Sequence, residues 1–160
     1  MKQTVSHGSF SLEREYPVPP ERVFAAFSTR EAKISWFAQG DEFLAEMKEY
    51  TLDFQVGGRE RLDATSTSGN RLVVETTFND IVENERIVAT YDVKVNDRRI
   101  SVSLWSVQLI ATENGTRLIT NEDGAFLDDL DDSKNRQSGV ERDLEQLRLY
   151  LERNSVPAAV

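Results

Sequence analysis

The stretch that decides the fold is S-G-V-E-R-D-L-E-Q-L-R-L-Y-L, which runs from Ser138 to Leu151. Its apolar residues recur at steps of four, three and four, and they are Val140, Leu144, Leu147 and Leu151. This spacing places them on one stripe of an α-helix, with charged residues on the opposite side. At about 1.5 Å per residue the helix is roughly 21 Å long, enough to cross four or more strands about 4.8 Å apart. The stretch therefore predicts a C-terminal helix that packs across a sheet.

Most of the chain before this helix alternates between apolar and polar residues, which is typical of half-buried strands. The alternation predicts seven strands, over residues 9–16, 42–54, 59–65, 71–82, 87–95, 100–111 and 116–122. Turn residues separate them, and the strongest hairpin signal is Asn114-Gly115. After the first strand, Pro19-Pro20 followed by Glu21 predicts a short helix over 20–27. Ser28 or Thr29 then caps a second short helix over 30–37.

Two details of the strand pairing can be predicted from the pattern. If the turn after Val82 pairs this residue with Ile87, Phe78 lies opposite Tyr91. The apolar positions of the next strand switch from even to odd numbers at Leu104-Trp105. One extra residue in a strand causes such a switch, so we expect a β-bulge there.

Composition limits the class of protein. The 160 residues fit one domain, 1–160, with an ordered core over about 9–152. The net charge of −9 argues against nucleic acid and against anionic membrane surfaces as partners. The absence of cysteine excludes disulfides, thiol nucleophiles and thiolate metal sites. No signal-peptide pattern and no run of about 18 apolar residues is present, so we predict a cytoplasmic protein without membrane insertion.

Several motifs resemble one known group of proteins. They are P-E-R-V-F-A-A-F over 20–27, Trp36-Phe37, D-F-Q-V-G-G-R over 53–59, G-T-R-L over 115–118 and the closing helix. Together they resemble the SRPBCC (START-like) superfamily, and within it the branch related to activators of the heat-shock chaperone ATPase. The stretch G-A-F-L-D over 124–128, with Arg136 and Gly139, is similar to one bacterial subgroup of that branch. Val140 departs from the pattern, since an aromatic residue is frequent there.

This resemblance implies an α+β helix-grip fold: a curved antiparallel sheet of about seven strands wrapped around the long C-terminal helix, with two short helices after the first strand. It also implies a largely apolar cavity between sheet and helix for a small hydrophobic ligand. Pockets of this kind combine apolar walls with a few orienting polar groups. We predict that seven residues line it: Trp36, Phe54, Phe78, Tyr91, Trp105, Val140 and Leu144. The alternative is that these side chains fill the core completely.

Candidates for catalysis or metal binding are few. His7 is the only histidine and lies in the polar leader, which makes a role as base or ligand improbable without partners. The acidic residues 128–132 lack the spacing of a calcium loop, so a solvated loop is the better interpretation. Glu46, Asp53 and Tyr91 are the groups that could act as acid or base if they entered the cavity. We therefore assign no catalytic residue, no metal and no cofactor.

Three functions follow as hypotheses. The first is binding of a small hydrophobic or amphipathic ligand without catalysis. The second, implied only by the resemblance, is a co-chaperone role in the stress response, in which the protein stimulates a heat-shock chaperone ATPase and the negative charge complements a basic partner. The third is a cyclase or hydrolase acting on a ligand in the cavity. A homodimer is a further expectation at the level of the family.

Overall fold

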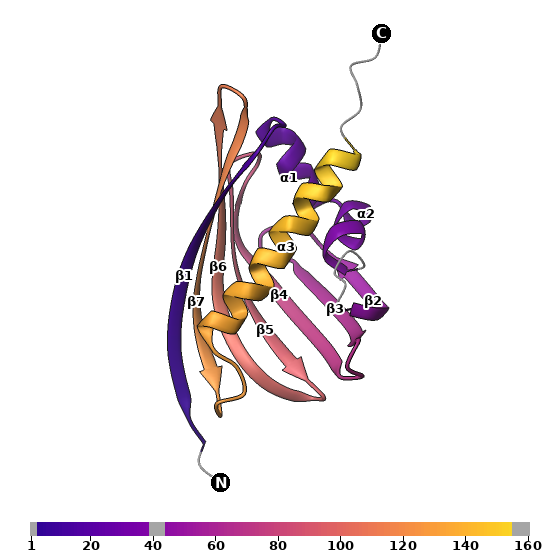
Figure 1. Ribbon diagram of the computed structural model, residues 1–160, viewed down its shortest axis with the longest axis vertical. Helices are drawn as coiled ribbons and strands as arrows, with labels where there is room; N and C mark the ends of the chain where they lie inside the picture. Colours follow the sequence, from indigo (N-terminus) through magenta and orange to yellow (C-terminus); the bar gives the residue numbers. More distant parts are fainter. Residues whose placement is uncertain (1–2, 39–43, 155–160) are drawn as a thin grey trace.

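In the computed structural model, which describes residues 3–38 and 44–154, a curved sheet wraps around one long helix (Figure 1). The strands are β1 (Val5–Tyr16), β2 (Leu44–Leu52), β3 (Arg59–Ser66), β4 (Arg71–Val82), β5 (Arg86–Val95), β6 (Arg98–Thr112) and β7 (Gly115–Leu127). The helices are α1 (Pro20–Ser28), α2 (Arg30–Lys33), the π-helical turn η1 (Ile34–Ala38) and α3 (Ser133–Arg153). The sheet has the order β1-β7-β6-β5-β4-β3-β2, and its neighbours are antiparallel. This arrangement confirms the predicted α+β helix-grip fold.

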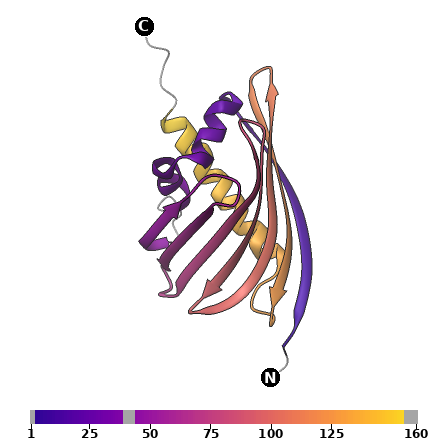
Figure 2. The same cartoon turned by 180° about the vertical axis from the view of Figure 1, so that it is seen from behind.

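The second short helix differs from its prediction, because α2 ends at Lys33 and η1 continues it to Ala38. The predicted strand over 42–54 is shorter at its end, since β2 stops at Leu52; residues 42–43 lie outside the described residues. Figure 2 shows the sheet from its outer face, with α3 behind it.

Helix α3 begins earlier than the apolar stripe alone predicts. Asp132 caps it: its Oδ1 accepts a hydrogen bond of 2.7 Å from the backbone N–H of Asn135. The predicted stripe is confirmed further along the helix, where Leu144, Leu147 and Leu151 are buried. The early start matters for the site, because it makes Arg136 a helical residue held over the sheet.

The core lies between the inner face of the sheet and the helices α1 and α3. Tyr16 of β1 donates a hydrogen bond of 3.1 Å from its hydroxyl to the Leu144 carbonyl, which links the edge of the sheet to the middle of α3. The Trp36 indole donates to the Ala26 carbonyl at 2.8 Å, which fixes η1 against α1. These buried polar contacts fix α3 to the edge of the sheet and η1 to α1.

The predicted pairing of β4 with β5 is wrong in register. Phe78 lies opposite Ala89, and Tyr91 lies opposite Thr76. The turn closes one residue earlier than predicted, and Asn84 within it has a φ of 64°. A bulge between Phe78 and Asp80 adds the second shift. Phe78 and Tyr91 nevertheless face the same side of the sheet, because an even total shift preserves the alternation.

The predicted bulge at Leu104-Trp105 is also wrong. Strand β6 pairs with β7 without interruption there, and the shift in its pairing with β5 lies at Ile100. Val102 and Leu104 are 44% and 46% exposed on the outer face, whereas Ser101 and Ser103 are buried. The apolar pattern was misleading because the inward positions of this segment are serines.

The paired glycines before β3, Gly57 and Gly58, lie in a tight turn. A Cβ on Gly58 would lie 2.1 Å from the Asp53 carbonyl oxygen, whereas Gly57, with a φ of 84°, has open space around it. The turn is joined to β4, because Gly57 donates to the Phe78 carbonyl at 2.8 Å and Phe78 donates to the Gly58 carbonyl at 3.0 Å. The close approach of backbone to backbone therefore requires glycine at position 58.

We expect Gly58→Ala to lower the free energy of unfolding by about 3 kcal/mol, because the backbone of the turn must move. Gly57→Ala is the matched control, and it should cost about 1 kcal/mol for the left-handed conformation alone. Urea denaturation of both variants measures the difference. Equal losses would show that steric contact at position 58 is not what the turn depends on.

Candidate functional site

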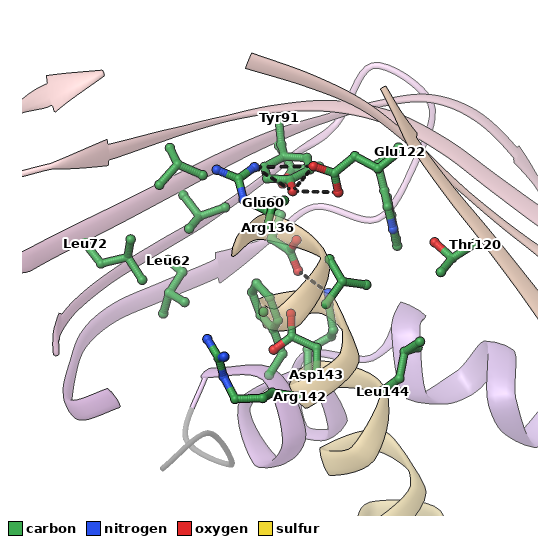
Figure 3. A pocket seen from close by; sticks show the side chains of 18 of the residues that line it. Glu60, Leu62, Leu72, Tyr91, Thr120, Glu122, Arg136, Arg142, Asp143 and Leu144 are labelled. Carbon is green, nitrogen blue, oxygen red and sulfur yellow. Dashed lines mark hydrogen bonds and ion pairs between the residues drawn. The ribbon is translucent and has the colours of Figure 1, made fainter. Parts of the chain in front are cut away.

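A cavity of about 340 Å³ lies between the inner face of the sheet and the helical segments α2, η1 and α3 (Figure 3). Its volume falls at the small end of the range of about 300–1,000 Å³ for ligand pockets. Most of its walls are apolar, and they include Phe27, Phe37, Leu62, Leu72, Val74, Val93, Ile100 and Val107. The structure therefore contains an open space at the place where the sequence predicts a ligand cavity.

Five of the seven predicted site residues line this cavity: Trp36, Tyr91, Trp105, Val140 and Leu144. Phe54 and Phe78 instead pack edge to face, with ring centroids 5.0 Å apart, in the core near α1. Phe54 also meets Phe24 of α1 at 5.6 Å. Contact of any of the seven with a ligand stays a prediction.

Arg136 of α3 is the centre of a buried polar cluster on one wall. Its side chain is 10% exposed, and its guanidinium lies 3.3 Å from Glu122 Oε2 and 3.1 Å from Asp131 Oδ2. It donates to the Tyr91 hydroxyl at 3.0 Å, and Tyr91 donates in turn to Glu122 (Figure 3). The guanidinium also donates to the hydroxyls of Ser101 and Ser103. These bonds give the two buried serines of β6 hydrogen-bond partners.

Tyr91 acts in this cluster as a neutral hydroxyl. Burial is the main cause that raises its pKa above the ordinary value for tyrosine. The Arg136 charge opposes this change, and the Glu122 charge strengthens it. Tyr91 therefore keeps its proton at neutral pH and serves as a donor to Glu122 rather than as a base.

A second buried ion pair lies on the side of the cavity formed by α2 and β3. Lys33 Nζ is 3.1 Å from Glu60 Oε2, and the two side chains are 6% and 5% exposed. The ammonium group also lies 4.1 Å from the centroid of the Phe37 ring and 5.1 Å from that of Trp36. The Tyr50 hydroxyl donates to the same Glu60 oxygen, and burial, followed by the Glu60 charge, raises the Tyr50 pKa. This pair is therefore nearly buried, with aromatic rings on the side of the ammonium group.

The sheet connects the two clusters through one row of inward side chains. In the strand pairing, Glu60 of β3 lies opposite Thr76 of β4, Thr76 opposite Tyr91 of β5, and Tyr91 opposite Ser103 of β6. All four are on the inner face, and Glu60, Thr76 and Tyr91 line the cavity. Thr76 is thus the polar residue between the two ion-paired clusters.

Four residues that line the cavity were not predicted from the sequence: Lys33, Glu60, Thr76 and Glu122. Arg136 was named only within the family resemblance. A usable signal existed for Glu122, since it continues the even positions of β7 that bury Leu118 and Thr120. The carboxylates that were considered, Glu46 and Asp53, are exposed and do not line the cavity.

His7 is exposed and belongs to β1, where it pairs with Ala125, so it does not lie in a leader before the strand. The acidic residues 128–132 form a turn, with left-handed backbone at Asp128 and Asp129, followed by the α3 cap. Within residues 3–38 and 44–154, no group of three or more His, Asp or Glu side chains is placed to hold a metal ion.

A family model described as "Activator of Hsp90 ATPase homolog 1-like protein" matches residues 17–152. The solved structure of an uncharacterized protein from Rhizobium leguminosarum is 38% identical, with a TM-score of 0.90, over 96% of this chain and 100% of that one. The Mll3558 protein from Rhizobium loti is 36% identical, with a TM-score of 0.84, over 92% and 99% of the two chains. Comparison with curated proteins gave no match. Among the described helices, none is long and apolar enough to cross a membrane.

Proposed function

From the premise that the chain belongs to the activator of Hsp90 ATPase homolog 1-like family, we propose that it binds a small hydrophobic or amphipathic molecule in the cavity between the sheet and α3. The observation that carries the proposal is the cavity of about 340 Å³, with apolar walls and polar groups at defined places. Trp36, Tyr91, Trp105, Val140 and Leu144 are the predicted contacts. Phe54 and Phe78 would support the walls from behind.

Two physical arguments favour a ligand over a merely imperfect core. Protein interiors are packed nearly as densely as organic crystals, and voids much larger than a water molecule are few. Buried ion pairs contribute little net stability, and apolar residues of the same volume are often equally good or better. A core selected for stability alone has no need of Arg136 and Lys33 beside an open space. In a binding site, the open space holds the ligand and the buried polar groups orient it.

Two experiments test the proposal: identification of any bound molecule, and measurement of its binding after a larger side chain is placed in the cavity. Native mass spectrometry of the protein purified from its own cell extract, followed by denaturation, should release and weigh a small molecule. Val140→Trp should weaken its binding about tenfold or more, because the indole would occupy the space beside α3. The change should leave the secondary structure intact, as circular dichroism would show.

The control is Glu145→Trp, which adds the same side chain on an exposed position of the same helix. This variant should bind like the unchanged protein. If Val140→Trp bound the molecule with unchanged affinity, the binding site would have to be elsewhere.

The description of the family favours a second candidate, stimulation of a heat-shock chaperone ATPase. The net charge of −9 would suit a partner with a basic face. Mixing the protein with the chaperone and measuring ATP hydrolysis tests this role, and an unchanged rate would remove it. A homodimer, which is expected at the level of the family, also stays a prediction.

Catalysis of the cyclase or hydrolase type remains the third hypothesis, since titratable groups do reach the cavity. Tyr91, the acid or base considered from the sequence, is best suited to donate a hydrogen bond, because its raised pKa keeps it protonated. A catalytic role would be revealed by a bound or released molecule whose mass changes on incubation with the protein.

A further inference from the structure

We propose that the ligand of this cavity is uncharged and carries a hydroxyl or amide group that Thr76 and Glu60 hold. This inference rests on the proposed function and narrows it to one chemical class. Its apolar part would lie against the aromatic and aliphatic walls, and its polar group would reach the row of side chains on β3 and β4.

The charged groups that line the cavity already have partners. Lys33 pairs with Glu60, and Arg136 pairs with both Glu122 and Asp131. Arg142 and Asp143 of α3, which also line the cavity, have interactions as well. A carboxylate or ammonium group on a ligand that paired with Lys33, Glu60 or Arg136 would therefore compete with a buried ion pair that already exists. A neutral ligand avoids this loss of a buried charge's partner.

Thr76 provides the polar contact that is still available. Its side chain lines the cavity and the residue is only 6% exposed, yet no side-chain hydrogen bond within the described residues involves its hydroxyl. In the described part of the chain, no fully buried side-chain oxygen or nitrogen lacks a partner. The Thr76 hydroxyl must therefore touch the open space of the cavity. A polar group held this deep without a partner loses hydrogen-bonding energy unless a ligand or water supplies it.

Glu60 supplies a complementary acceptor beside it. Both of its contacts, from Lys33 and from the Tyr50 hydroxyl, go to Oε2. Glu60 and Thr76 are directly paired across β3 and β4, so their Cβ atoms are about 4.5–5.5 Å apart. One ligand hydroxyl can thus accept from Thr76 and donate to Glu60 Oε1. The arrangement disfavours an anion, because the Glu60 charge would repel it.

Three probes with the same ten-carbon tail separate the chemical classes: n-decanol, decanoate and decylammonium. The chain has two tryptophans, Trp36 and Trp105, and both line the cavity, so the intrinsic fluorescence of the whole protein reports binding directly. We expect n-decanol to bind about tenfold or more tightly than either ion. Thr76→Val should then weaken n-decanol binding by about 3- to 10-fold, the effect of one hydrogen bond.

Two variants make this result specific. Thr76→Ser keeps the hydroxyl and should retain most of the affinity. Thr77→Val makes the same change on the outer face of β4, and it should have no effect on binding. Circular dichroism of each variant checks that the sheet is intact.

Each outcome has a defined meaning. Equal or tighter binding of decanoate or decylammonium would overturn the inference but leave the proposed function standing. Tight binding of n-decanol that Thr76→Val does not change would overturn the assigned contact. Failure of all three probes to bind would count against both the inference and the proposed cavity function.

Discussion

Arg136→Met is expected to lower the free energy of unfolding by about 3–5 kcal/mol, which is the usual loss when one member of a buried ion pair is removed. The substitution keeps most of the side-chain volume but leaves Glu122 and Asp131 without their cation. The side chains of both carboxylates are almost inaccessible to solvent, with 1% and 6% exposed. Both carboxylates would then be poorly hydrated charges without a cation. Urea denaturation followed by circular dichroism measures the loss.

Arg148→Met is the matched control on the same helix. Arg148 is also ion-paired, with Glu145 and Glu152, but all three side chains are largely exposed. Its removal should cost less than about 1 kcal/mol. Adding Glu122→Gln to Arg136→Met should recover part of the lost stability, because one uncompensated charge disappears. Similar losses for the two arginines would contradict the structural role given to the Arg136 cluster.

Lys33→Met should have a comparable effect, about 3–5 kcal/mol, at the opposite side of the cavity. Glu60 would then be a buried carboxylate whose remaining contact is the Tyr50 hydroxyl. The aromatic rings of Phe37 and Trp36 would also lose the ammonium group that lies over them. Thermal and urea denaturation of the variant measure the combined cost.

The double variant Lys33→Met with Glu60→Gln separates the two contributions. It should regain much of the stability, since no buried charge remains without a partner. Lys134→Met, at an exposed position of α3, serves as the control for the loss of one positive charge from the chain. A single Lys33→Met variant as stable as this control would show that Glu60 is not held by Lys33 in solution.

Much of the fold could be predicted because its signals are local. The stripe from Val140 to Leu151 predicts α3, and the hairpin residues separate strands whose alternation has a period of two. The register could not be predicted in the same way. A bulge such as the one after Phe78 changes the pairing without changing which residues are apolar, and the start of α3 depends on a cap at Asp132 rather than on the stripe.

The candidate site was predicted in part, and for a clear physical reason. The aromatic side chains that line the cavity are large and apolar, so sequence analysis selects them. Charged residues are usually found on the surface, so sequence patterns do not select Arg136, Lys33 or the carboxylates that pair with them. Only the tertiary structure shows that they are buried. The two serines of β6 led to an error. Because Ser101 and Ser103 are polar and Val102 and Leu104 are apolar, the pattern assigned the apolar pair to the core, although the serines point inward.

The row formed by Glu60, Thr76, Tyr91 and Ser103 has a consequence for folding as well as for binding. In a sheet, sliding one strand past its neighbour by a single residue turns every side chain to the other face. A one-residue slip of β3 would turn Glu60 away from Lys33, and a slip of β5 would turn Tyr91 away from Arg136. Each slip would also place another polar residue in the apolar interior. Correctly aligned strands give Glu60, Tyr91 and Ser103 their partners at once. The polar lining of the cavity therefore favours the native register of the strands, because sheets with a shifted register are less stable.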